Sequence, residues 1–291
     1  MRGGLKVLTD CIRCNGFVFI MSLFCTAVAS AGEGKLLETA GVTQIEGAAG
    51  GGLVPWAVLA GYDSREETSG TVFSTRVSVD DYRLYAYGAA VSLYDRVELS
   101  VAHQTFDLLD TPFEINQNII GAKVRLYGDV VYSRWPQLAA GVQYKTLLDN
   151  ALADALGADS SDSGTDFYLA ASKAHLGAFA GYNLFWNLSL RTTRANQFGL
   201  LGYGGSRNDG YELMAEASLA VFLSRHIVLG VDYRQKPDNL AGLREDDASD
   251  AFIAYLPNKQ FNLTAAWVDL GTIAGAKDQT GLYVSVTGYL W

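Results

Sequence analysis

The residues able to carry enzyme chemistry are few. The chain has three histidines, His103, His175 and His226, and a hydrolase would need one of them beside a Ser nucleophile or an Asp. His226 lies near Ser224, but no catalytic motif surrounds it, while His103 falls on an apolar phase and His175 lies near an expected turn. The sequence therefore predicts a protein that is not an enzyme, and a hydrolase that depends on His226 is the weakest of three hypotheses.

Charged side chains within apolar segments are the more informative set. If these segments are β-strands, successive side chains point to opposite sides. Each charged side chain then points to the side opposite to the apolar residues of its segment, so a closed wall of such strands would place all of the charges inside. A lining of six basic and three acidic residues would favour anions in a pore. The alternative is that these side chains pair with one another and fill a narrow interior. The predicted lining residues are Arg76, Glu98, Lys123, Arg125, Lys145, Arg191, Glu216, Asp232 and Arg234.

Two acidic groups could bind divalent cations that bridge to lipopolysaccharide. Neither has the regular ligand spacing of a Ca²⁺ loop, so we interpret both as solvated exterior loops and predict no metal and no cofactor. The glycine-rich run 202–210 resembles a phosphate-binding loop only superficially, because it lacks a Lys and a following helix. The acidic groups are Asp238, Glu245, Asp246, Asp247 and Asp250, and Asp159, Asp162 and Asp166.

The segments that would position these charges alternate with a period of two, which is typical of β-strands. A soluble β-sandwich alternates as well. A basic side chain that faces lipid costs roughly 2–4 kcal/mol at mid-bilayer. We therefore assign the apolar side of each strand to the lipid and the charged side to the interior. Tyr and Trp near strand ends favour a bilayer over a sandwich. Examples of the lipid phase are Phe73, Thr75, Val77 and Val79 against Arg76, and Val97, Leu99 and Val101 against Glu98.

The connections also alternate. Tight turns are expected near Asp95, Arg225 and Asn258, and long polar loops over 107–116, 146–165, 195–210, 235–250 and 270–279. This asymmetry, with 49% hydrophobic residues and no apolar run long enough for a spanning helix after Gly32, predicts an all-β, transmembrane, antiparallel up-and-down barrel. Counting back from Trp291 gives about 12 strands over residues 71–291. Residues 32–70 form either a plug or periplasmic segment, or a first hairpin that raises the count to 14.

The N-terminal segment has the features of a secretory signal. Three basic residues precede the apolar stretch 17–28, and Ala29-Ser30-Ala31 provides a cleavage site before Gly32. We expect residues 1–31 to be removed, and with them all three cysteines, Cys11, Cys14 and Cys25. The whole chain has 22 basic and 31 acidic residues. Removal of the signal takes away three basic residues and Asp10, which leaves 19 basic and 30 acidic residues. That acidic balance argues against nucleic acid as a partner.

Several motifs along the mature chain resemble a family of proteobacterial outer-membrane β-barrels that is catalogued as a domain of unknown function. The resemblance implies a location in the outer membrane and brings no reaction or site residues. The motifs are Gly47-Ala48-Ala49-Gly50-Gly51-Gly52, Pro55-Trp56-Ala57-Val58, residues 94–100, Gly121-Ala122-Lys123-Val124-Arg125, residues 164–168, Arg194-Ala195-Asn196-Gln197, residues 236–240 and Arg244-Glu245-Asp246-Asp247.

From these observations we predict an outer-membrane barrel that acts as a passive channel or transporter for small solutes through a basic lumen. The second hypothesis is a barrel that does not conduct and serves a structural or surface-interaction role. The expected partners are outer-membrane lipid, lipopolysaccharide and the barrel assembly machinery, which would recognise the aromatic terminal residue Trp291.

Overall fold

The computed structural model describes residues 40–109, 111, 113–158 and 161–290. The predicted signal peptide, residues 32–39, Asp159 and Trp291 lie outside the described residues. Among the described residues no helix is long and apolar enough to cross a membrane. The helical elements in this part of the chain are one short α-helix, α2 (Ala151–Ala155), and one 3-10 turn, η1 (Asn196–Gly199).

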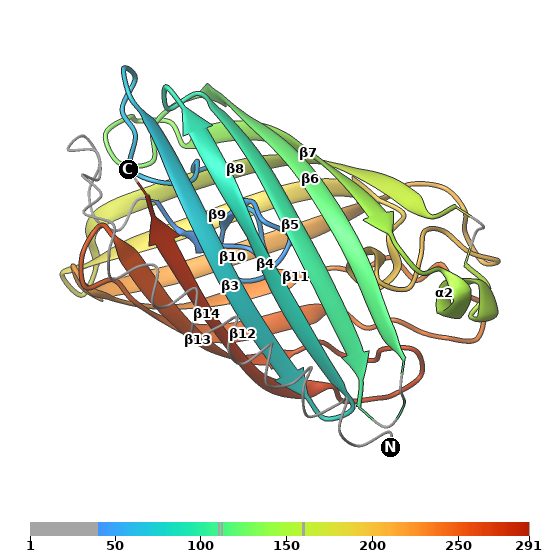
Figure 1. Cartoon of the computed structure of the whole chain (residues 1–291). Helices are drawn as coiled ribbons and strands as arrows, with labels where there is room; N and C mark the ends of the chain where they lie inside the picture. Colours follow the sequence, from blue (N-terminus) through green and yellow to red (C-terminus); the bar gives the residue numbers. More distant parts are fainter. Residues whose placement is uncertain (1–39, 110, 112, 159–160, 291) are drawn as a thin grey trace.

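Twelve antiparallel strands form a closed barrel, in which each strand pairs with its neighbours in sequence and the last pairs with the first (Figure 1). This confirms the predicted fold class and the count of 12. The strands are β3 (Thr68–Val79), β4 (Tyr82–Leu93), β5 (Val97–Leu108), β6 (Glu114–Tyr127), β7 (Gln137–Leu147), β8 (Ser163–Phe179), β9 (Tyr182–Thr193), β10 (Glu212–Ser224), β11 (Ile227–Arg234), β12 (Ala248–Tyr255), β13 (Phe261–Asp269) and β14 (Thr280–Tyr289).

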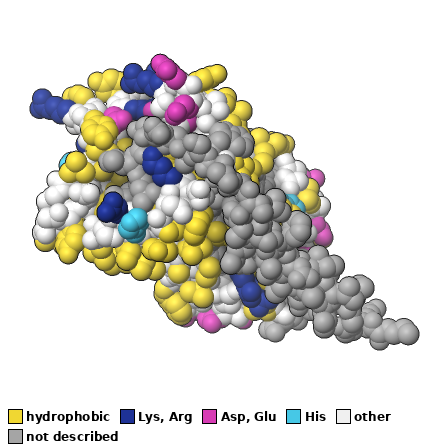
Figure 2. Space-filling model, turned by 60° about the vertical axis from the view of Figure 1, so that its left-hand side comes forward, with side chains coloured by type: hydrophobic (Ala, Val, Ile, Leu, Met, Phe, Trp, Pro, Cys, Tyr) yellow, Lys and Arg dark blue, Asp and Glu magenta, His cyan; other side chains and the backbone are white. Residues whose placement is uncertain are grey.

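The outer surface of the barrel is apolar and its interior is polar. Leu99, Ile120 and Leu188 are at least half exposed on the outside, whereas Glu98 and Lys123 on the opposite phase are 1% exposed. Figure 2 shows hydrophobic side chains gathered over broad parts of the outer wall. A closed wall with this polarity is the architecture of a transmembrane β-barrel, because lipid contacts its outer face and every strand edge is paired.

Strand β3 corrects the predicted phase. Phe73 and Val77 face the interior, where Thr75 shares a hydrogen bond of 2.8 Å with Ser285 of β14. Arg76 is exposed on the outer surface, and its guanidinium lies 5.5 Å from the centre of the Tyr85 ring. The prediction that Arg76 lines the interior was wrong. Ser and Thr occur on both phases of this strand, so a single Arg near the strand end decided the assignment, and a long basic side chain at that position can reach the polar interface.

The two ends of the barrel differ. The turn end carries the connections after β4, β6, β8, β10 and β12, most of them tight, together with the start of β3 and the end of β14. The loop end carries the two-residue link after β3 and five further loops, 109–113, 148–162, 194–211, 235–247 and 270–279. This confirms the predicted alternation, except that the connection 128–136 at the turn end is longer than expected.

Residues 40–63 lie inside the barrel, and we name this segment the plug. It forms a small hairpin of β1 (Val42–Thr43) and β2 (Ala49–Gly50), contributes no strand to the wall, and is buried at every position. The plug is the blue segment that crosses the interior in Figure 1. Trp56 Nε1 donates to Ser218 Oγ at 2.8 Å, and Ala57 N donates to Ser172 Oγ at 2.9 Å. The plug is therefore bonded directly to the inner wall.

Candidate functional site: the plug and its charged cradle

One carboxylate of the plug sits among three basic side chains of the wall. Arg234 of β11 contacts Glu46 in a two-point arrangement, with Nη1 2.8 Å from Oε2 and Nη2 3.1 Å from Oε1. Lys145 of β7 donates to Glu46 Oε1, and Nη2 of Arg191 on β9 lies 3.7 Å from Glu46 Oε2. Two parallel N–H bonds from one guanidinium give strong and geometrically specific carboxylate binding.

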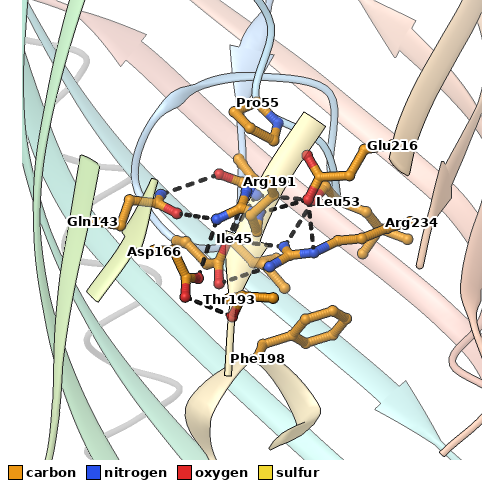
Figure 3. A network of polar contacts seen from close by, with 12 residues as sticks. Ile45, Leu53, Pro55, Gln143, Asp166, Arg191, Thr193, Phe198, Glu216 and Arg234 are labelled. Carbon is orange, nitrogen blue, oxygen red and sulfur yellow. Dashed lines mark hydrogen bonds and ion pairs between the residues drawn. The ribbon is translucent and has the colours of Figure 1, made fainter. Parts of the chain in front are cut away.

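Two acidic residues of the wall complete this cluster. Arg191 Nε lies 2.6 Å from Glu216 Oε1, and Arg191 Nη1 lies 3.2 Å from Asp166 Oδ2. Asp166 also pairs with Lys145 at 2.7 Å, and Glu216 with Arg234 at 3.3 Å. Figure 3 shows Arg191 in the centre, with Glu216 and Arg234 to one side and Asp166 to the other. We name these five wall residues, Lys145, Asp166, Arg191, Glu216 and Arg234, the cradle.

Charge balance explains why the cradle holds Glu46 in its ionised form. The cradle carries three positive and two negative charges, and Glu46 makes the total neutral. Burial alone would raise the pKa of Glu46, but the nearby charges of Arg234, Lys145 and Arg191 overcome this effect and hold its pKa well below the usual range. The plug carboxylate therefore remains charged inside the barrel.

A loop from the loop end covers the cradle. In this loop Gln197 and Phe198 adopt positive φ angles of 43° and 64°, which are uncommon for residues other than glycine. The turn directs the Phe198 carbonyl toward Lys145 Nζ at 3.1 Å and places the Phe198 ring 4.3 Å from the guanidinium of Arg234. Figure 3 shows the Phe198 ring beside Arg234. Strained backbone of this kind persists only where surrounding contacts hold it.

A second ion pair binds the backbone of the plug. Lys123 Nζ lies 3.1 Å from Glu98 Oε2 and donates to the carbonyls of Ala49 and Val58 at 2.9 and 2.8 Å. Glu98 in turn accepts from the amides of Ala49 at 3.2 Å and Ala60 at 2.8 Å. One wall pair therefore binds the plug backbone at two places, in β2 and over residues 58–60.

A third interior group is acidic without a basic partner. Asp232 and Asp250 are register partners on β11 and β12, 1% and 6% exposed. Asp232 Oδ2 accepts from the amide of Leu53 at 3.2 Å, whereas neither side-chain oxygen of Asp250 has a hydrogen-bond partner. The plug approaches through glycine here, because a Cβ on Gly51 would stand 2.2 Å from Asp232 Oδ2. Any larger residue at position 51 would displace the carboxylate.

The predicted lining residues other than Arg76 have inward, buried side chains. Arg125 lies toward the turn end, where it pairs with Asp95 and Asp129. Sequence reasoning missed Glu46, Asp166 and Asp250 as interior residues, and it assigned both aspartates to exterior acidic loops. The alternation of Asp166 with Phe167 and Leu169, which are exposed on the outer wall, was the available signal.

The interior is close to neutral, so the structure does not support a basic lumen. Among the described residues, eight buried acids accompany six buried bases inside the barrel and at its ends. The acids are Glu46, Asp63, Glu98, Asp166, Glu216, Asp232, Glu245 and Asp250, and the bases are Lys123, Arg125, Lys145, Arg191, Arg234 and Lys236. Lys173 is also buried, but it lies on the outward phase of β8 under the connection 128–136.

The histidines lie apart from one another. His103 Nδ1 contacts Asn118 Oδ1 at 2.7 Å on the outer surface, and His175 Nε2 accepts from the Trp186 indole at 3.1 Å. His226 contacts the Leu256 carbonyl at 2.8 Å at the turn end. In the described part of the chain, no three potential ligands of the His, Cys, Asp or Glu type come together to hold a metal ion.

Solved structures similar to this chain are bacterial barrels of low sequence identity. They include the KdgM porin, with 11% identity, a TM-score of 0.49 and coverage of 75% of this chain and 98% of that one. An outer membrane channel from Pseudomonas putida F1 has 13% identity, a TM-score of 0.41 and coverage of 76% and 94%. Outer membrane phospholipase A from Escherichia coli has 10% identity, a TM-score of 0.39 and coverage of 76% and 92%.

No curated protein sequence matches the chain. The model of the family described as "Protein of unknown function (DUF3034)" matches residues 39–287, and the chain therefore belongs to that family.

Proposed function

We propose that this protein is an outer-membrane barrel that acts as a gated channel for small polar solutes and is closed when the plug occupies its interior. The observation that carries the proposal is the plug itself, a buried segment bonded to the wall by polar and ionic contacts. Such contacts can be exchanged for contacts with water or solute, whereas an added wall strand could not leave without opening the sheet. This proposal keeps the predicted channel for small solutes but not its basic lumen.

The orientation and partners follow from the same proposal. Short turns face the periplasm in outer-membrane barrels and longer loops face the exterior, so the turn end and the plug attachment would lie on the periplasmic side. Outer-membrane lipid would contact the apolar wall, and lipopolysaccharide would contact the loop end. Recognition of Trp291 by the barrel assembly machinery stays a prediction, because that residue lies outside the described part of the chain.

The second candidate is a barrel that does not conduct, with a structural or surface-interaction role. The density of the interior network favours it, since Lys145, Arg191 and Arg234 are all buried and each forms ion pairs with at least two carboxylates. A plug held so firmly could serve as a permanent filling of the barrel. The two functions differ in whether the plug can leave.

A redox-controlled lock on the plug tests the proposal. Thr43 Oγ1 of the plug lies 3.1 Å from Thr287 Oγ1 of β14, so cysteines at these positions would need only a small adjustment to form a disulfide. The three natural cysteines all lie within residues 1–31, which leaves the engineered pair alone in the mature chain. We expect Thr43→Cys/Thr287→Cys to conduct in planar bilayers when reduced and to fall silent when oxidised.

The single variant Thr43→Cys, taken through the same redox cycle, is the matched control and should conduct in both states. Measurable and equal conductance of the oxidised and reduced double variant would contradict plug gating. Silence in both states, with retained heat-modifiable folding, would favour the barrel that does not conduct.

A further inference from the structure

We infer that the cradle is a binding site for the carboxylate of a small solute, and that Glu46 of the plug occupies this site as a tethered substitute. The inference rests on the proposed gating function and names the class of solute that would use it. A solute carboxylate that competes with Glu46 would weaken the hold of the wall on the plug, so binding would be coupled to opening.

The geometry around Glu46 is that of a ligand site. A bidentate guanidinium from Arg234, an ammonium from Lys145 and a second guanidinium from Arg191 converge on one carboxylate. They come from three different strands, β11, β7 and β9, whose positions are fixed by the closed sheet. Preorganised donors of this kind bind an anion with little loss of their own conformational entropy.

The charge of the cradle selects a group with a single negative charge. Without Glu46, the three basic and two acidic residues of the cradle leave one uncompensated positive charge, all of it in buried side chains. One carboxylate restores neutrality, whereas a dianion would leave a buried negative charge and a neutral sugar would leave a positive one. The cradle is therefore matched to a monocarboxylate group.

Two atoms of the cradle are not fully engaged by the plug. Arg191 Nη2 and Glu216 Oε2 are buried and lack hydrogen-bond partners, and Arg191 Nη2 lies 3.7 Å from the nearer Glu46 oxygen. A buried guanidinium nitrogen left without an acceptor costs stability. A free carboxylate, unconstrained by the plug backbone, could move within hydrogen-bond distance of it, and a neighbouring hydroxyl could donate to Glu216.

A binding experiment tests this without any need for conductance. The probes are D-glucuronate and D-glucose, which differ in the carboxylate, titrated by calorimetry into the refolded mature chain in detergent. Glu46→Gln removes the internal competitor and keeps the shape of the side chain. We expect this variant to bind glucuronate at least about tenfold more tightly than the unmodified chain, because the substituted amide carries no charge that competes for the three basic side chains, and neither protein to bind glucose.

Addition of Arg234→Gln to Glu46→Gln should abolish the binding of glucuronate. Equal glucuronate affinity of the unmodified chain and Glu46→Gln, or equal binding of glucose and glucuronate, would overturn the inference. A second readout keeps Glu46 in place: Ala48→Cys buries a thiol in the plug, and glucuronate, but not glucose, should accelerate its reaction with a maleimide. An unchanged rate of alkylation would also overturn it.

The two proposals fail separately. If Glu46→Gln binds glucuronate but the chain never conducts, the carboxylate site is supported and the channel is contradicted. If the chain conducts in a gated way but does not bind glucuronate in preference to glucose, the channel is supported and the carboxylate site is contradicted.

Discussion

Two groups of acidic residues lie buried in the barrel interior, one in the cradle around Glu46 and the other formed by Asp232 and Asp250. They differ in whether the acids have basic partners. In the cradle every acid has a basic partner within 4 Å. The aspartate pair has no ion-pair partner among the described residues, and both oxygens of Asp250 lack hydrogen bonds. The comparison indicates that the barrel tolerates buried charge where the local sum is neutral and leaves a destabilising site where it is not.

The difference also separates two ways of holding the plug. The cradle binds a side chain of the plug through charge, whereas Asp232 accepts a hydrogen bond from the backbone amide of Leu53. Loss of one cradle residue therefore leaves several charges unpaired, whereas loss of the Asp250 carboxyl removes a buried group that has no hydrogen-bond partner.

The largest expected effect comes from removing the central cation of the cradle. Arg191→Leu would leave Glu216, Asp166 and Glu46 with one fewer positive partner, and breaking a buried ion pair from one side costs about 3–5 kcal/mol. The free energy of unfolding, from urea titration of the refolded chain followed by tryptophan fluorescence, should fall by that amount. Arg207→Leu is the matched control, because Arg207 is half exposed in its pair with Asp238 and should cost less than about 1 kcal/mol. Similar losses in the two variants would contradict the importance of burial.

The same substitution at two buried aspartates should have opposite signs. Asp166→Asn removes a charge that Lys145 and Arg191 require and should destabilise the chain, whereas Asp250→Asn removes an unpartnered carboxylate and should stabilise it. The change for Asp166→Asn should lie on the order of 1–3 kcal/mol, the range for a buried polar group left unpaired, and the change for Asp250→Asn should be smaller, because the amide is as unpartnered as the carboxyl that it replaces. The check is the shift of the urea midpoint at pH 7. Destabilisation by both variants would mean that Asp250 has a role that its contacts do not reveal.

A third buried acid, Glu245 in the loop 235–247, should make the loop end sensitive to pH. Burial raises the pKa of Glu245 to about 7, although the charge of Lys236 lowers it in part. A carboxyl with a raised pKa contributes stability that is present below its unfolded pKa, near 4.5, and is lost as pH rises toward 7. Trypsin cleavage after exposed Arg244 should therefore accelerate between pH 5 and pH 8.

Glu245→Gln is the control for this measurement, since it keeps the acceptor for the Gln197 amide without the titration. After correction for the pH dependence of trypsin itself, its cleavage rate should be nearly independent of pH. A variant that follows the same pH profile as the unmodified chain would show that another group titrates.

The smallest effect is expected for a basic residue on the outer face. Arg76 is exposed near the loop end of β3 and contacts the Tyr85 ring and Ser78. A charge near the membrane interface costs only about 0–1 kcal/mol, so Arg76→Leu should change the urea midpoint little. A loss of several kcal/mol, comparable to that of Arg191→Leu, would mean that Arg76 does not face lipid.

Much of the wall could be predicted because its signal is local. Apolar and polar residues alternate in segments such as 97–102 and 227–234, and the closed sheet places them as expected. Strand β3 shows the limit, since Ser, Thr and Val on both phases give no energetic preference. The aspartates at 166 and 250 were misplaced because they stand near strand ends beside acidic loops, where composition resembles that of a loop and the alternation begins within one residue.

The sequence by itself determined a closed antiparallel wall with about twelve strands after residue 70, because lipid contact and backbone pairing impose a period of two that can be read residue by residue. Only the tertiary structure decided that residues 40–63 lie inside and that Glu46 completes the cradle. Glu46 lies 99 residues from Lys145 and 188 from Arg234, and no local pattern specifies which distant charges a buried carboxylate will meet. Their pairing is fixed by closure of the barrel around the plug, where each buried charge must find its counterpart.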